Sequence, residues 1–96
     1  MQIFKSVRYC VVNVLSPPNL VEVLGRTGLC YREDGRQMFV DSEVLTGSSG
    51  MAVYKDTIQK WNPLYDNVRV TDSDRDRILN NIRDAFRSQG FEIDVI

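Results

Sequence analysis

One amphipathic segment near the C-terminus is the feature that most constrains the fold of this chain. Apolar residues recur there at intervals of three and four, which places them on one face of an α-helix. They are Ile78, Leu79, Ile82, Ala85 and Phe86. Thr71 stands where an N-terminal capping residue is expected, and Gly90 stands where a helix closes. Because this is the only good helical pattern in the sequence, we expect one helix whose apolar face packs on a sheet.

The remaining segments favour strands. Four of them before residue 46 are rich in β-branched, aromatic or alternating apolar residues, and they span residues 7–15, 19–24, 29–33 and 36–40. Asp34-Gly35 predicts a two-residue hairpin, because both turn positions adopt positive φ, and residues 41–45 extend its second arm. Residues 51–61 alternate up to Asn62-Pro63, which predicts a strand bent midway, and residues 91–96 predict a last strand.

These segments together predict an α+β fold. We expect a mainly antiparallel sheet of five to six strands, with one C-terminal helix packed on a face and a final short strand. A chain of 96 residues lies at the low end of domain sizes, so residues 1–96 are expected to form a single domain.

The overall charge argues against nucleic acid as a partner. Twelve basic and thirteen acidic side chains give a net charge of −1, which does not attract a phosphate backbone. The N-terminus lacks the pattern of a signal peptide, and no apolar run approaches the length that spans a bilayer. Cys10 and Cys30 are few and lie in strand-like sequence, where we expect buried core residues. A cytoplasmic protein without membrane contact is therefore expected.

The residue types for catalysis are missing or poorly arranged. The sequence contains no His, which removes the commonest general base and metal ligand. Residues 47–50 are small and polar but lack the spacing of a nucleophile elbow or a phosphate loop. Asp66, Asp72, Asp74 and Asp76 lack the ligand spacing of a calcium loop, and helix capping accounts for most of them. We expect no enzymatic activity, no cofactor and no metal.

Binding surfaces are less clearly marked in the sequence. Four arginines flank the predicted helix, at positions 75, 77, 83 and 87, but neighbouring Asp residues blunt their charge and favour an ordinary solvated face. Trp and Tyr are residue types that anchor protein interfaces. The sequence leaves open whether Trp61, Tyr54 and Tyr65 belong to the core or to a contact surface.

Several blocks in the C-terminal half resemble the bacterial immunity protein 74 family. They are the segment from Val53 to Trp61, then Pro63, then the segment from Thr71 to Leu79 that leads to Ala85-Phe86. The resemblance covers residues 51–96. It implies a small cytosolic protein encoded beside a polymorphic toxin, such as the effector of a contact-dependent growth inhibition system, which it binds and blocks.

The resemblance also implies a mechanism without catalysis, in which a pre-formed surface covers the active site of the cognate toxin domain. If the toxin is a nuclease, its groove is basic, and acidic side chains would steer the encounter. The contacts expected on this basis are Trp61 and Tyr65 as apolar anchors and Asp66, Asp72, Asp74 and Asp76 as acids.

Two other classes remain open. A small single-strand nucleic-acid-binding domain would bind phosphate and lose affinity steeply with salt. An accessory protein-interaction domain would bind a protein without inhibiting it. Co-expression with the neighbouring toxin separates them, since only an immunity protein rescues the cells.

Overall fold

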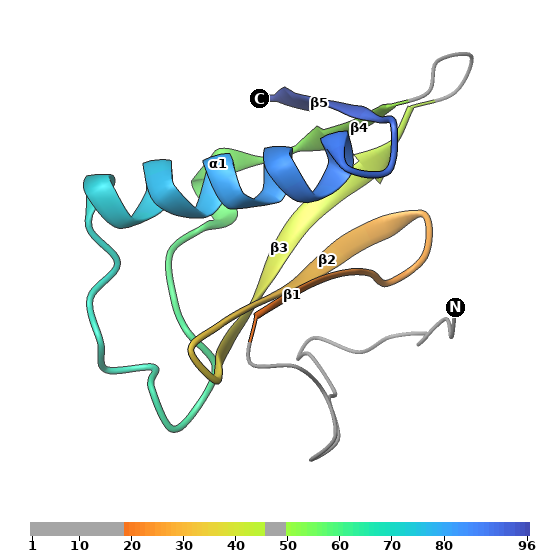
Figure 1. The fold of residues 1–96 in the computed structure, drawn as a ribbon. Helices are drawn as coiled ribbons and strands as arrows, with labels where there is room; N and C mark the ends of the chain where they lie inside the picture. Colours follow the sequence, from red (N-terminus) through yellow and green to blue (C-terminus); the bar gives the residue numbers. More distant parts are fainter. Residues whose placement is uncertain (1–18, 46–49) are drawn as a thin grey trace.

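The computed structural model describes residues 19–45 and 50–96, in which five strands form one sheet and a single helix covers one face of it (Figure 1). The strands are β1 (Leu20–Val23), β2 (Thr27–Glu33), β3 (Arg36–Val44), β4 (Gly50–Val53) and β5 (Glu92–Val95). They lie in chain order across the sheet. The first three pairings are antiparallel and β4 pairs with β5 in parallel. The predicted α+β class is confirmed.

The β2–β3 hairpin is as the sequence predicts. Asp34 and Gly35 have φ angles of 49° and 79°, the positive values that this two-residue turn requires. The turn sets the register in which Tyr31 lies opposite Met38. Alternation along both strands therefore directs Leu29, Tyr31, Met38 and Val40 into the core cluster that the helix covers.

The predicted strand over residues 51–61 is wrong beyond Val53. β4 ends there, and the chain forms a short 3₁₀ turn, η1 (Lys55–Thr57). Thr57 then accepts a hydrogen bond at its Oγ1 from the backbone amide of Asp41, 2.9 Å away, which replaces a strand pairing along β3. Ile58 is buried in the core behind this turn. Polarity alternates through the whole segment, but sheet partners on both sides exist only as far as Val53.

The helix α1 (Asp72–Arg87) carries the chain from β4 to β5, and this crossover explains the one parallel pairing. Thr71 accepts a hydrogen bond from the backbone amide of Asp74, and the Asp74 carboxylate accepts one from the amide of Thr71. This capping box starts the helix where predicted. Ile78 and Ile82 are fully buried against the sheet. Gly90, with φ 83°, follows the helix end.

Some predictions concern residues that the structure does not describe. The strand over residues 7–15, the loop over residues 46–49 and Cys10 lie outside the described residues. Cys30 is buried with Leu24 on the sheet face opposite the helix, as expected for a core position. Across residues 19–45 and 50–96, no helix is long and apolar enough to cross a membrane.

Candidate interaction surface

The segment between η1 and the helix forms a turn that projects from the sheet; we call residues 62–70 the projecting turn. The Asn62 amide donates to the Gln37 carbonyl on β3, 2.7 Å away. Within the turn, the Tyr65 amide donates to the Asn62 carbonyl at 2.9 Å, and the Val68 amide donates to the Tyr65 carbonyl at 3.0 Å. An antiparallel bridge joins residues 60 and 69 at its base. These bonds hold the backbone of the turn in one conformation.

Trp61 fixes the base of the projecting turn to the core. Its side chain is only 2% exposed and packs beside Tyr31, with ring centroids 6.3 Å apart. The Arg36 guanidinium lies over the indole, 4.6 Å from the ring centroid, in cation–π geometry. The sequence suggested Trp61 as an apolar anchor for a partner. At this burial it offers a partner almost no contact area, and its role in the structure is to hold the turn.

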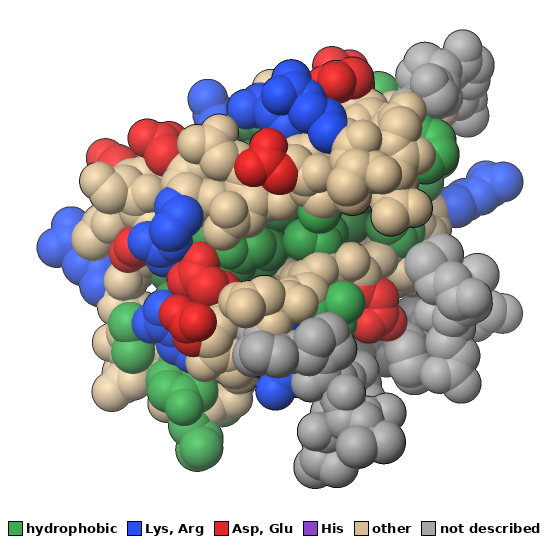
Figure 2. Space-filling view, viewed as in Figure 1, with side chains coloured by type: hydrophobic (Ala, Val, Ile, Leu, Met, Phe, Trp, Pro, Cys, Tyr) green, Lys and Arg blue, Asp and Glu red, His purple; other side chains and the backbone are tan. Residues whose placement is uncertain are grey.

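The end of the projecting turn is apolar and exposed. Leu64 is 88% exposed, Tyr65 43% and Val68 38%. Figure 2 shows hydrophobic side chains standing out at the lower left of the molecule, where Figure 1 places this turn. Leu is among the residue types most often buried, and three neighbouring exposed apolar side chains form a patch rather than scattered single residues. Such a patch is suited to contact another protein.

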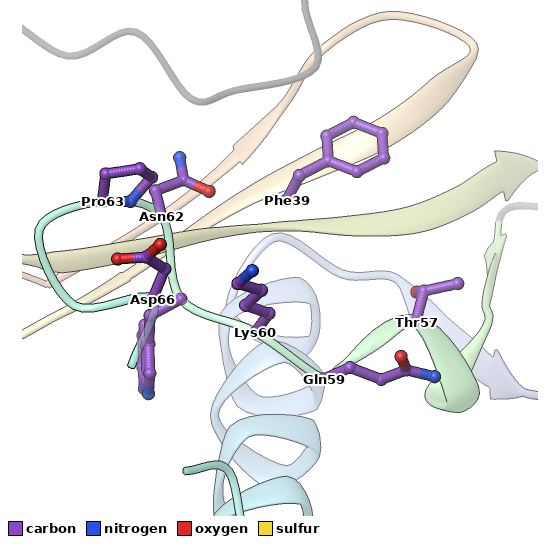
Figure 3. Close-up of a pocket in the computed structure, with 8 residues that line it drawn as sticks. Phe39, Thr57, Gln59, Lys60, Asn62, Pro63 and Asp66 are labelled. Atoms are coloured by element: carbon purple, nitrogen blue, oxygen red, sulfur yellow. The ribbon is translucent and has the colours of Figure 1, made fainter. Parts of the chain in front are cut away.

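A hollow of about 310 Å³ lies beside the projecting turn. Phe39 from β3 forms one side of it, and Lys60, Asn62 and Asp66 from the turn and its base form the other (Figure 3). The lining mixes aromatic, cationic and acidic groups. Because Asp66 reaches both this hollow and the exposed turn, the two features belong to one surface.

The acids at the start of α1 do not all have the same role. The Asp72 carboxylate pairs with Arg75 at 2.7 Å, and the Asp74 carboxylate pairs with Arg77 at 2.8 Å. The backbone hydrogen bond of the capping box and the bond from Arg77 lower the pKa of Asp74 to about 2. Asp76 is exposed and, within the described residues, forms no ion pair.

Asp66, like Asp76, is an exposed acid without an ion-pair partner in the described part of the chain. It is exposed in the projecting turn and has no cationic partner within 4 Å among the described residues. Of the four predicted acids, Asp66 and Asp76 therefore keep a charge that is available to a partner. Asp72 is compensated by an arginine of its own helix, and Asp74 is used mainly to cap it.

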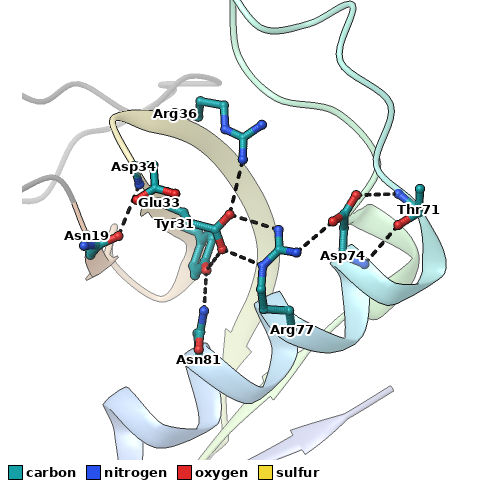
Figure 4. Close-up of polar contacts among 9 residues, drawn as sticks. All are labelled: Asn19, Tyr31, Glu33, Asp34, Arg36, Thr71, Asp74, Arg77 and Asn81. Atoms are coloured by element: carbon teal, nitrogen blue, oxygen red, sulfur yellow. Dashed lines mark hydrogen bonds and ion pairs between the residues drawn. The ribbon is translucent and has the colours of Figure 1, made fainter.

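A polar network that the sequence analysis missed ties α1 to the sheet (Figure 4). Arg77 Nε and Nη2 donate to the two carboxylate oxygens of Glu33, each at 2.9 Å. The Tyr31 hydroxyl donates to the same carboxylate at 2.8 Å, and Arg36 Nη2 approaches it at 3.4 Å. The Asn81 amide in turn donates to the Tyr31 hydroxyl at 2.9 Å. No local pattern predicts this network, because its hairpin residues and its helix residues lie more than 40 positions apart in the sequence.

The network suits a structural role. Burial alone would raise the pKa of Glu33, but hydrogen bonds from Arg77 and Tyr31 outweigh it and lower the pKa below the ordinary 4.5. Burial raises the pKa of Tyr31 to about 12. Both groups therefore keep one protonation state near neutral pH, unlike a general acid or base. Within the described residues, no three metal-ligating side chains of the His, Cys, Asp or Glu type gather together.

Comparison with known proteins gives one match. The family model described as Immunity protein 74 matches residues 21–96, from within β1 to the end of the chain. Searches of curated proteins and of solved structures found no match. The match covers the sheet, the projecting turn and the helix, and so extends further towards the N-terminus than the resemblance seen over residues 51–96.

Proposed function

The chain belongs to the immunity protein 74 family, and we propose that it binds a cognate bacterial toxin domain and neutralises it by covering the toxin's active site. The observation that carries this proposal beyond the family is the projecting turn, which presents apolar side chains on a backbone that is already fixed. A pre-formed surface of this kind loses little conformational entropy on binding. Inhibition by occlusion also requires no chemistry from the immunity protein itself.

The proposed contact surface combines the projecting turn with the start of α1. Of the six contacts suggested by the sequence, we retain Tyr65, Asp66, Asp72 and Asp76, which are exposed. We assign Trp61 to the core and Asp74 chiefly to the helix cap, on the burial and hydrogen bonds described above.

We further propose that the toxin is a nuclease effector of a contact-dependent growth inhibition system. A nuclease binds a phosphate backbone through a basic groove. Asp66 and Asp76 form no ion pair within the described residues, so they would attract such a groove and accelerate association. The immunity protein would then act in the cytoplasm, where the toxin reaches its substrate.

Co-expression tests the function. Cells that produce the toxin domain encoded beside this gene should survive only when this protein is also produced, and the purified pair should form a complex. Survival without this protein, or death despite it, would reject the immunity function. A tight complex without rescue would identify an accessory interaction domain instead.

Charge reversal tests the acidic contribution. We expect Asp66→Lys with Asp76→Lys to lower the association rate constant about tenfold at low salt and less at high salt. The matched control is Asp94→Lys, which reverses an exposed acid on the edge strand β5. If the control lowers the association rate constant as much as the double variant does, the proposed steering by Asp66 and Asp76 is rejected.

A further inference from the structure

We propose that Leu64 is the anchor of the interface and enters an apolar pocket on the toxin domain; this inference rests on the proposed function. Leu64 is 88% exposed, whereas the other exposed large hydrophobic residues in the described part of the chain reach at most 57%. A Leu at such exposure contributes almost nothing to the core of this molecule. Its apolar area is available in full to a binding partner.

The structure presents this side chain on a rigid support. Backbone hydrogen bonds at 2.9 Å and 3.0 Å close two successive turns. The first spans Asn62 to Tyr65 and contains Leu64, and the second begins at Tyr65. The base is held by the buried Trp61, on which Arg36 stacks. Because the backbone is ordered before binding, most of the free energy from burying Leu64 would appear as affinity. This arrangement is typical of a projecting anchor that fills a cavity.

The shape and charge of the molecule favour a different protein over a second copy as the partner. A two-fold dimer in which the two turns meet would place convex surfaces against each other, which cannot enclose either Leu64. In any other contact between copies, two-fold or head-to-tail, Leu64 would have to enter a hollow on the other copy. The hollow beside Phe39 contains Lys60 and Asp66, and a second hollow of about 350 Å³ is lined in part by Arg32 and Asn81. Both linings include a charged side chain. A third hollow, lined mainly by Val21, Val23, Ala85 and Phe86, is apolar but measures only about 100 Å³, which leaves little room for an entering Leu side chain.

The residues beside Leu64 indicate what surrounds the toxin's pocket. Tyr65 and Val68 add partly exposed apolar area on the same turn, so the pocket should have an apolar wall that extends beyond one side chain. Asp66 lies two positions after Leu64 in the same turn and forms no ion pair within the described residues. An Arg or Lys at the rim of the pocket would therefore complement it. The site on the toxin domain that receives Leu64 is therefore an apolar cleft with a basic rim.

The test is Leu64→Asp, measured as the Kd for the toxin domain encoded beside this gene. We expect binding to weaken at least about 30-fold, the size found for interface anchors. Leu64→Met, which keeps an apolar side chain of similar volume, should bind within about threefold of the parent protein. The control is Ile96→Asp at the C-terminus, which is 57% exposed and which Figure 1 places at the opposite end of the molecule from the turn. It should also stay within about threefold.

Urea unfolding of each variant shows whether the substitution also affects folding. Because Leu64 is too exposed to contribute to the core, its variants should unfold like the parent protein. If Leu64→Asp unfolds early, Leu64→Ser replaces it in the binding assay. Parent-like affinity of the Leu64 variant, alongside a parent protein that still rescues cells, would overturn the anchor and leave the immunity function standing. Failure of the parent protein to bind or rescue would instead reject the function. Sedimentation that shows a parent dimer dissociated by Leu64→Asp would reassign the turn to self-association.

Discussion

Replacing Arg77 with Met tests how α1 is held on the sheet. Arg77 donates two hydrogen bonds of 2.9 Å to the Glu33 carboxylate, whose side chain is 11% exposed. The substitution keeps most of the apolar stem and removes both donors. Glu33 then keeps only the Tyr31 hydroxyl at 2.8 Å and the more distant Arg36 at 3.4 Å. A nearly buried carboxylate is left without its main cation.

The expected loss of stability follows from this geometry. Removing one member of a buried ion pair costs roughly 3–5 kcal/mol, whereas exposed pairs contribute about 0–1 kcal/mol. This pair lies between the two cases, because the Arg77 side chain is 43% exposed and Glu33 retains two other donors. We therefore expect the free energy of unfolding to fall by about 2 kcal/mol at pH 7.

The pH dependence of Glu33 should reverse in this variant. In the parent protein the pKa of Glu33 is lowered, so its contribution is present above the ordinary pKa of 4.5 and is lost as pH falls through the folded value. Without Arg77, burial is the largest remaining influence, so we expect the pKa of Glu33 to rise above 4.5. Its contribution is then greatest below pH 4.5 and is lost as pH rises. The loss of unfolding free energy in the variant, relative to the parent, should consequently be smaller at pH 5 than at pH 7.

Urea unfolding followed by the fluorescence of Trp61, the only Trp in the sequence, measures both effects. Arg83→Met is the matched control, because Arg83 lies on the same helix and its one side-chain hydrogen bond within the described residues is an exposed contact of 3.4 Å to Asn80. It should change stability by less than about 0.5 kcal/mol. If Arg77→Met also changes it by less than that, and equally at pH 7 and pH 5, the network does not hold the helix.

Three further predictions concern the core, the helix cap and a buried phenol. Ile82→Ala should lower the free energy of unfolding by about 2–5 kcal/mol, since Ile82 is fully buried, and the same urea assay measures it. Thr71→Ala should cost about 1 kcal/mol through loss of the cap, while Thr71→Ser should restore it. Absorbance titration of the parent protein, compared with Tyr31→Phe, should show one phenol with a pKa of about 12. The stabilising contribution of Tyr31 is fully present below its ordinary pKa of 10.0 and is lost as pH rises through the folded pKa of about 12.

The parts of the fold that the sequence predicted depend on signals a few residues apart. Asp34 and Gly35 specify a two-residue turn by their own backbone preferences, and their φ angles in the structure agree. Thr71 and Asp74 satisfy each other's backbone amides, so the helix start is encoded within four positions. The apolar stripe behind them required only the helical repeat.

The parts that the sequence did not predict depend on contacts between distant segments. Residues 54–61 alternate like a strand, yet β5 provides a partner for β4 only as far as Val53. Trp61 is buried because Tyr31 and Arg36 from the hairpin surround it. The sequence does not mark Leu64 as a contact, since Leu favours the core; its exposure follows from its place in a turn that projects from the sheet. None of these outcomes is written in a local pattern.

Arg36 connects the two structural features on which the functional proposal depends. Its guanidinium stacks over Trp61 at the base of the projecting turn and also reaches the Glu33 carboxylate that holds α1. The start of that helix carries Asp72 and Asp76, while the turn carries Leu64 and Asp66. Because one side chain contacts both supports, the apolar and acidic parts of the proposed surface are held by a shared scaffold. A partner that requires both parts in fixed positions would therefore meet a surface that needs little rearrangement.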